Sequence, residues 1–344
     1  MKCPSCGYNQ KKKMGTTCGS CSYGFVFTGF DGMTDGRWLG LIEKTSAEGT
    51  YFFTENQLFA TYCKKQQKPG WLKVPGCLLP GTVLTLVAAM VVSENSALTF
   101  GDAFWRFGAL LGLFGLWLWS DLRSGSGSAT AAQAGDSSHT DFRLKVAKWE
   151  GRRPTEKLLR SPQLETAPPE AQETDLYDYG VESVLIVDED RLVDLLVLNN
   201  FHAQERCVVI SRTGYPGYLV PRVRDVLEGR TDLPVFVLHN SSIEGQLLPH
   251  QAVDLDLGVV NHPVIDLGWN SRAAQQLGRL NFLRTAGWVQ SIPVDLVPPR
   301  RLLPALATAM QQRLPLAAFL GAEQVAGAWT EDGDRHWVDS DDFG

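Results

Sequence analysis

The chain lacks the sequence patterns that identify several large enzyme classes. Its 344 residues contain no phosphate-binding loop of the Walker A type, no Gly-x-Gly-x-x-Gly dinucleotide fingerprint and no Ser-His-Asp arrangement. Four histidines show no metal-ligand spacing, so we expect them at the surface: His202, His250, His262 and His336. These absences argue against a P-loop nucleotidase, a dinucleotide-dependent oxidoreductase and a triad hydrolase.

The chain also lacks a strong overall charge. Its formal net charge is −6 and its pI is about 5.6, so no global field attracts nucleic acid. The charge is uneven, however. Residues 1–73 are rich in lysine, whereas Glu331–Asp342 holds six acids against one arginine. We therefore expect residues 321–344 to form a solvated acidic tail.

One long stretch contains no charge at all. Val74–Ser93 has the length that a helix needs to cross a hydrocarbon core about 30 Å thick, and Ala103–Ser120 is a second apolar run. The sequence therefore predicts two transmembrane helices within residues 74–120. A buried helical hairpin in a water-soluble core is the alternative.

The charges that flank these runs predict an orientation. Lysines precede the first run and Arg123 follows the second, while the loop between them, Glu94–Asp102, carries only acids. The positive-inside rule then places both termini in the cytoplasm, in a multi-pass protein of the inner (cytoplasmic) cell membrane. We expect no cleavable signal peptide, because Met1–Lys13 is polar and contains cysteine.

Four of the seven cysteines lie in the first 21 residues, as two Cys-x2-Cys pairs: Cys3, Cys6, Cys18 and Cys21. Two such pairs predict a tetrahedral, structural Zn²⁺ site in a zinc ribbon over residues 1–26. A redox dithiol pair is the alternative. Lys11–Lys13 between the pairs would suit phosphate contact, or they form only a solvated turn.

Residues 27–73 predict a small helix-turn-helix or winged-helix-like unit. We expect Asp35 to cap a first helix, and Thr54 to cap a second one with Gln57 completing a capping box. Units of this kind bind DNA, but they also serve as dimerisation or packing modules.

Residues 121–176 have the composition of a linker. Ser124–Ser138 is rich in glycine, serine and alanine, and Ser161–Thr174 is rich in proline and acid. Between them, Phe142–Lys157 is expected to contribute one or two strands.

Residues 177–320 alternate short apolar runs with helical patterns, which predicts an α/β domain with a mainly parallel sheet. The expected strands are 182–188, 207–211, 234–239, 263–268 and 292–296. The expected helices are 190–201, 218–228, 271–283 and 299–312.

Within this domain, Arg212–Gly245 resembles the Toprim domain of the topoisomerase VI A subunit and its meiotic double-strand-break relatives. Gly214-Tyr215-Pro216 matches the turn of that family before a helix, and the strand LPVFVL matches the next strand. Thr54–Tyr62 resembles the helix of the family's winged helix that carries the catalytic tyrosine. The resemblance implies a Mg²⁺-dependent site at the strand ends.

The sequence departs from the family where the metal would bind. Asn240 and Ser242 stand at the positions of the Asp-x-Asp pair, whereas Asp188 keeps an acid at the first strand. Mg²⁺ prefers charged oxygen ligands, so these changes remove much of what would hold it. In the winged helix, Phe59-Ala60 replaces the expected tyrosine.

We therefore expect a non-catalytic, membrane-anchored protein that binds nucleic acid or a protein partner. Because strand ends converge on the ligand crevice, the expected binding residues are Asp188, Tyr215, His239, Asn240 and Glu244. The alternative is a metal-dependent phosphodiester hydrolase, in defence against foreign DNA, with Mg²⁺ held by Asp188, Glu189 and Glu244. Two other interpretations remain open. The acids after the first strand only cap the next helix, or the chain is a purely structural scaffold.

Overall fold

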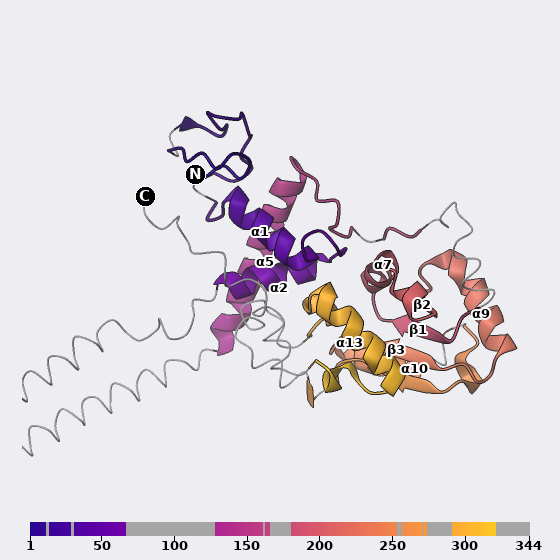
Figure 1. Ribbon diagram of the computed structural model, residues 1–344. Helices are drawn as coiled ribbons and strands as arrows, with labels where there is room; N and C mark the ends of the chain where they lie inside the picture. The colour runs from indigo at the N-terminus through magenta and orange to yellow at the C-terminus, as the bar shows by residue number, and fades with distance from the viewer. Residues whose placement is uncertain are drawn as a thin grey trace, which may run out of the picture. The chain divides into compact units, whose positions relative to one another are not determined.

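The computed structural model describes residues 1–11, 14–28, 31–66, 128–160, 162–165, 180–252, 255, 257–270, 272–273 and 291–320. Met1–Lys64 and Gly135–Gly344 form one compact unit, and Lys65–Ala134 forms another. The sheet, its helices and the metal-ligand candidates described below all belong to the first unit (Figure 1).

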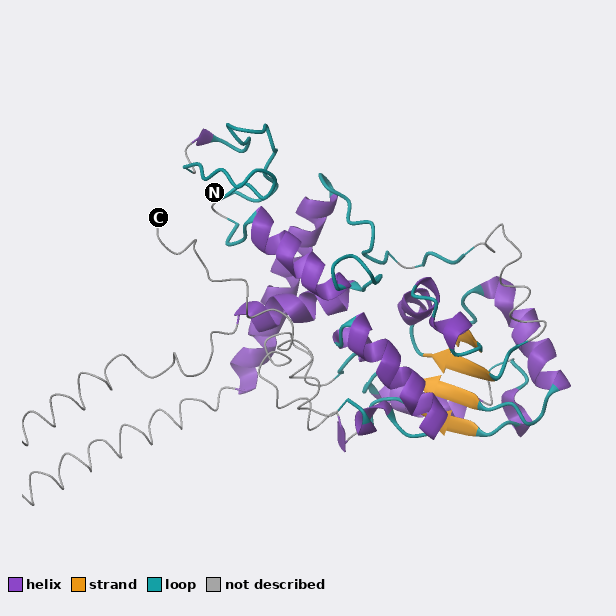
Figure 2. Cartoon of the chain, in the orientation of Figure 1, coloured by secondary structure: helices purple, strands orange, loops and turns teal. Residues whose placement is uncertain are grey.

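Four parallel strands form the centre of the α/β domain (Figure 2). They are β1 (Ser183–Val187), β2 (Cys207–Ser211), β3 (Val235–Leu238) and β4 (Val264–Asp266), in the order β2-β1-β3-β4. The first three are short apolar runs in which every residue is buried, as is typical of a parallel sheet covered by helices on both faces. The predicted parallel sheet is thus confirmed.

The helices of this domain connect and cover the strands. They are α7 (Asp190–Leu198), α8 (Phe201–Gln204), η3 (Gly217–Leu219), α9 (Val220–Gly229), α10 (Ile243–Gln251), η5 (Val259–Asn261), η6 (Val294–Leu296), α13 (Pro299–Gln312) and η7 (Leu316–Ala318). The helix expected over residues 299–312 is α13. The strand expected at residues 292–296 is instead the single turn η6, because Pro293 lacks an N–H and Asp295 has a ψ of 21°.

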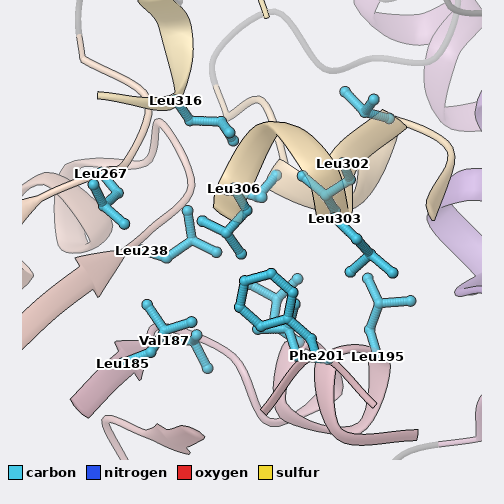
Figure 3. Packing of buried hydrophobic residues seen from close by; sticks show 14 of the residues in the cluster. Leu185, Val187, Leu195, Phe201, Leu238, Leu267, Leu302, Leu303, Leu306 and Leu316 are labelled. Carbon is cyan, nitrogen blue, oxygen red and sulfur yellow. The ribbon is translucent and has the colours of Figure 1, made fainter. Parts of the chain in front are cut away.

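Each face of the sheet has its own apolar core. On one face, Leu185 and Leu238 pack with α7 and with Leu306 of α13, and Figure 3 shows these side chains converging from sheet and helix. On the other face, Ile186 and Val237 pack with α9 and α10. The alternation of strand residues between the two clusters follows from the period of two along a strand.

A separate core lies under the N-terminal helices α1 (Asp35–Ser46) and α2 (Glu55–Gln66) and the long helix α5 (Ser128–Glu150). Its centre is aromatic. The ring centres of Trp38 and Trp149 lie 6.2 Å apart. Each also lies close to a phenylalanine ring, at 5.8 Å from Phe142 for Trp38 and at 5.9 Å from Phe27 for Trp149. Phe53 forms an isolated parallel bridge with Leu158 beside this core.

Helix α5 corrects two expectations for residues 121–176. It begins inside the predicted linker, and it runs to Glu150 where we expected a strand at Phe142–Lys157. The reason is that Phe142, Val146 and Trp149 recur at the spacing of one helix face, and all three are buried in the aromatic core. Of the predicted spacer at 161–174, only residues 162–165 are described, and the acidic tail at 321–344 lies outside the described residues.

The helix caps are partly as predicted. Thr54 and Gln57 form the expected capping box: the Thr54 N–H donates to Gln57 Oε1 at 2.9 Å, and the Gln57 N–H donates to Thr54 Oγ1 at 3.3 Å. Thr34, not Asp35, caps α1. The Asp35 carboxylate is used elsewhere, as described below.

Two of the histidines expected at the surface are buried. His262 is held between the carbonyl oxygens of Leu233 and Leu227, at 2.9 and 3.1 Å. His202 is buried in α8. Both imidazole rings are packed inside the fold. The absence of metal-ligand spacing around these histidines gave no information on whether they are buried.

The membrane prediction needs correction. In the part of the chain that the structure describes, no helix is both long enough and apolar enough to cross a bilayer. The longest, α5, has 23 residues but carries six charged ones. This finding contradicts the predicted fold class with two transmembrane helices and the predicted multi-pass inner-membrane location. Both predicted spans, Val74–Ser93 and Ala103–Ser120, lie outside the described residues.

Candidate functional site

The two cysteine pairs form one cluster. The four Sγ atoms lie within 4.8 Å of one another, with 3.6 Å between Cys3 and Cys21 and 3.7 Å between Cys6 and Cys18. Two of the cysteines are buried and two are exposed. The cluster could hold a metal ion. Among the residues that the structure describes, no other group of three or more His, Cys, Asp or Glu side chains is close enough to do so.

The N-terminal segment that carries the four cysteines is attached to the helices that follow it. The Asp35 carboxylate accepts hydrogen bonds from the backbone N–H groups of Val26 and Phe27, at 2.9 and 2.8 Å, and from the Tyr23 hydroxyl at 3.0 Å. From the other side, the Arg153 guanidinium lies 3.8 Å from the centre of the Tyr23 ring. The Tyr23 ring is therefore clamped between an acid and a base of the same chain.

A second polar cluster lies at the carboxyl ends of β1 and β3, where ligands bind in open α/β sheets. Asp188 Oδ2 accepts from the Asn240 backbone N–H at 2.7 Å. The Asn240 side-chain amide donates to Glu189 Oε1, and its Oδ1 accepts from the Val294 N–H at 2.6 Å. The structure thus brings together three of the predicted residues, and the amide of Asn240 joins them.

Arg191 lies among the acids of this cluster. Its guanidinium is 2.5 Å from Glu189 Oε2, and its Nε is 3.2 Å from Asp295 Oδ2. Asp295 is buried, and its other oxygen accepts from Asn56 Nδ2 of α2 at 3.0 Å. The Arg191–Asp295 contact is an ion pair without hydrogen-bond geometry.

Two acids of the cluster, Asp188 and Glu189, have raised pKa values. Burial raises the pKa of Asp188, in spite of the hydrogen bond from Asn240. Burial also raises the pKa of Glu189 to about 7; Arg191 opposes this shift, while Asp295 and Asp188 add to it. Burial would lower the pKa of Arg191, but the surrounding carboxylates raise it. Asp188 Oδ1 is buried and has no hydrogen-bond partner among the described residues.

His239 lies behind the tip of β3. Its Nδ1 is 2.7 Å from the Asn240 carbonyl oxygen, and its Nε2 is 3.0 Å from Asp266 Oδ1. Both partners can accept hydrogen bonds, an arrangement that favours the imidazolium form of the ring over the neutral one. Burial opposes this charge, but the bonds to Asp266 and Asn240 raise the pKa of His239. A Cβ on Gly268 would lie 2.3 Å from the ring, so only glycine fits there.

Two predicted residues do not join the cluster. The Tyr215 hydroxyl donates to Asp194 Oδ1 at 2.6 Å and accepts from the N–H groups of Gln163 and Leu164, at 2.9 and 2.5 Å. Glu244 is exposed on α10 and lies 3.5 Å from Arg212. Tyr215 therefore fastens the connecting segment to the domain, and Glu244 makes a surface ion pair.

Sequence reasoning missed Arg191, Asp295 and Asn56. Arg191 had a signal, since it follows Asp188 and Glu189 by one helical turn or less. Asp295 and Asn56 had none, because they are separated by 239 positions and come together only through the fold.

Comparison with protein-family models, with curated proteins and with solved structures found no match to this chain. Its function is therefore inferred from the chemistry of its own residues.

Proposed function

We propose that this chain is a non-catalytic binding protein for nucleic acid, in which Zn²⁺ shapes the N-terminal ribbon and a degenerate Toprim-like domain has exchanged its metal site for an internal polar network. A protein partner is the other ligand that this architecture would suit. The network at the strand ends carries the proposal.

The residues at the tip of β3 are already used by the fold. Asn240 makes three hydrogen bonds to its own chain, with Asp188, Glu189 and Val294. Ser241 Oγ accepts from the Ile292 N–H at 2.7 Å, and Ser242 Oγ caps α10 by accepting from Gly245 at 3.0 Å. An amide and two hydroxyls supply no charge, and their lone pairs are directed at backbone groups.

Arg191 fills the electrostatic role of a cation in this cluster. Its positive charge lies against Glu189 and Asp295, which a divalent ion would otherwise have to neutralise. The raised pKa of Glu189 weakens that side chain further as a ligand, because a carboxyl group binds a metal ion in its ionised form. The residues present do not fit Mg²⁺.

The cysteine cluster does fit Zn²⁺. A tetrahedral tetrathiolate with Zn–S bonds of about 2.3 Å places its sulfurs roughly 3.8 Å apart. The Cys3–Cys21 and Cys6–Cys18 separations, 3.6 and 3.7 Å, are close to that value, and all four sulfurs lie within 4.8 Å of one another. Since all four positions are thiolates, the ion would stabilise the ribbon and leave no open coordination site for chemistry.

The distribution of charge supports nucleic acid as the ligand. Residues 1–30 contain four lysines and no Asp or Glu, and residues 143–160 contain seven Lys or Arg against two Glu. These two basic stretches meet where Arg152 and Arg153 contact the ribbon, through hydrogen bonds to the carbonyl oxygens of Phe25 and Gly24. An otherwise acidic chain therefore concentrates positive charge on its ribbon, on the last turns of α5 and on the segment that follows α5.

The test is binding and cleavage by the full chain. We expect binding to labelled DNA or RNA that weakens as salt rises, because released counterions drive contacts to phosphate. We expect no cleavage with Mg²⁺ or Mn²⁺. No binding at low salt would refute the proposal.

A metal-dependent hydrolase is the second candidate. It is favoured by the unpartnered Asp188 Oδ1 and by the pKa of Glu189, which is suited to a general base at neutral pH. Cleavage with Mn²⁺ or Mg²⁺ that disappears in Asp188→Ala would establish it and overturn the non-catalytic reading.

A further inference from the structure

The two halves of the ribbon are built alike. Cys3 to Tyr8 and Cys18 to Tyr23 have the same spacing. In each, the N–H of the first cysteine donates to the carbonyl oxygen of the tyrosine, at 2.9 and 2.8 Å. In each, the residue before the tyrosine has a positive φ, 73° at Gly7 and 60° at Ser22. Tyr8 and Tyr23 are therefore equivalent positions of two matching turns.

The second of these tyrosines is engaged within the chain. Arg153 lies over the Tyr23 ring, its hydroxyl donates to Asp35, and its ring meets Phe25 edge-on with 5.4 Å between centres. The ring of Tyr23 therefore attaches the ribbon to the helices and is not available to a ligand.

The first tyrosine has no such role. The Tyr8 side chain is 44% exposed, although its turn has the same hydrogen bonds. Within the described residues it makes no side-chain hydrogen bond and no ring contact. A tyrosine held by a rigid metal-stabilised turn, with its ring directed at solvent, is a preformed surface for stacking.

The charge around Tyr8 indicates what would stack there. Lys2 pairs with Asn9, the neighbour of Tyr8, in an antiparallel bridge, and Lys11 follows three positions later; both lysines are exposed. Four lysines exceed the net charge of −2 that a zinc tetrathiolate would carry. The Tyr23 ring is covered by the guanidinium of Arg153 of the same chain. A guanidinium group of a partner protein would be repelled by the lysines near Tyr8, whereas a phosphate group would be attracted.

We infer that Tyr8 is a stacking platform for a base of single-stranded nucleic acid, with Lys2 and Lys11 contacting the phosphates on either side. This inference rests on the proposed function and names the surface that performs it. Single strands are favoured over duplexes because only an unpaired base offers its face to an aromatic ring.

The experiment measures fluorescence anisotropy of labelled oligothymidylate and of a duplex of equal length, titrated with the full chain. Tyr8→Ala should weaken binding to oligothymidylate roughly five- to a hundredfold, because stacking of one base accounts for a factor of that size. Tyr8→Trp should bind as well as the native chain. Val260→Ala, at a residue of η5 that is 67% exposed, serves as the matched control and should change nothing.

The zinc content of each variant shows whether its ribbon is intact. If Tyr8→Ala loses zinc, Tyr8→Leu compared with Tyr8→Trp decides, since leucine keeps the apolar bulk but not the aromatic face. Equal binding by the aromatic and aliphatic variants would overturn the inference and leave the proposed function standing. Absence of binding by the native chain, or binding confined to the duplex, would also overturn it; only the former would remove the proposed function as well.

Discussion

Replacing Arg191 by methionine removes the guanidinium from the cluster at the strand ends while keeping most of the length of the side chain. Its loss leaves Asp295, which is 1% exposed, with only the hydrogen bond from Asn56, and it leaves Glu189 beside two other acids. Removing one partner of a buried ion pair typically costs about 3–5 kcal/mol. Because Arg191 and Glu189 are each about a third exposed, solvent screens part of this, and we expect a loss of roughly 2–3 kcal/mol at pH 7.

The assay is equilibrium unfolding in urea, followed by far-ultraviolet circular dichroism, with the free energy of unfolding extrapolated to water. The second variant, Arg191→Met combined with Asp295→Asn, removes both charges of the buried pair. The amide oxygen introduced at position 295 can still accept a hydrogen bond from Asn56. The double variant should therefore recover at least half of the free energy of unfolding that the single variant Arg191→Met loses.

Two results would refute the reasoning. One is a stability of Arg191→Met within about 0.5 kcal/mol of the native chain, which is the range of ordinary surface substitutions. The other is a double variant that is no more stable than the single one, because the buried charge of Asp295 would then not be what Arg191 compensates.

Three further predictions concern the same unit of the structure. The pKa of Glu189 is raised from 4.5 to about 7, so between these pH values the folded chain holds a proton that the unfolded chain releases, and the free energy of unfolding falls as the pH rises from about 4.5 to 7. Glu189→Gln should remove roughly 1–2 kcal/mol of that fall in urea unfolding. Identical pH profiles of unfolding for the variant and the native chain would contradict this. Cys18→Ser should abolish stoichiometric zinc binding while Cys207→Ala, at a buried cysteine of β2, retains it, as measured by metal release to a chromogenic chelator. Asp35→Asn should lower the free energy of unfolding by about 1–3 kcal/mol, since an amide has one acceptor oxygen for three donors. Thr34→Ala should lower it by only about 1 kcal/mol, because it removes an ordinary helix cap. Equal losses of the two variants in urea unfolding would contradict this.

Short-range patterns in this sequence predicted local structure well. The runs at β1, β2 and β3 are continuous apolar segments of four or five residues bounded by turns, and their burial on both faces is what such runs indicate. The capping box at Thr54 and Gln57 is likewise a local pattern, of four residues, and it formed as expected. The spacing within each cysteine pair placed four thiolates together.

Patterns failed where composition competed with periodicity. The composition of the start of α5 favoured a linker, and the stretch from Phe142 was expected to form a strand. Burial of Phe142 and Trp149 in an aromatic core outweighs both expectations. Hydropathy predicted membrane spans, and the described helices do not include any. The partners of Arg191 could not be predicted at all, since Asp295 joins it from more than a hundred positions away.

The chemistry of Asn240 explains why an acid is absent from the tip of β3. The position must donate to Glu189 and also accept from the Val294 N–H, and an amide is the side chain that can do both at once. A carboxylate could accept from Val294, but in its ionised form it has no proton to donate to Glu189 and would face an ionised Glu189 with a like charge. The neutral amide of Asn240 and the guanidinium of Arg191 thus act in the same direction, because one adds no negative charge to the cluster and the other supplies a positive one. Together with Asp295 and Asn56 they form a network that joins the ends of β1 and β3 to η6 and to α2.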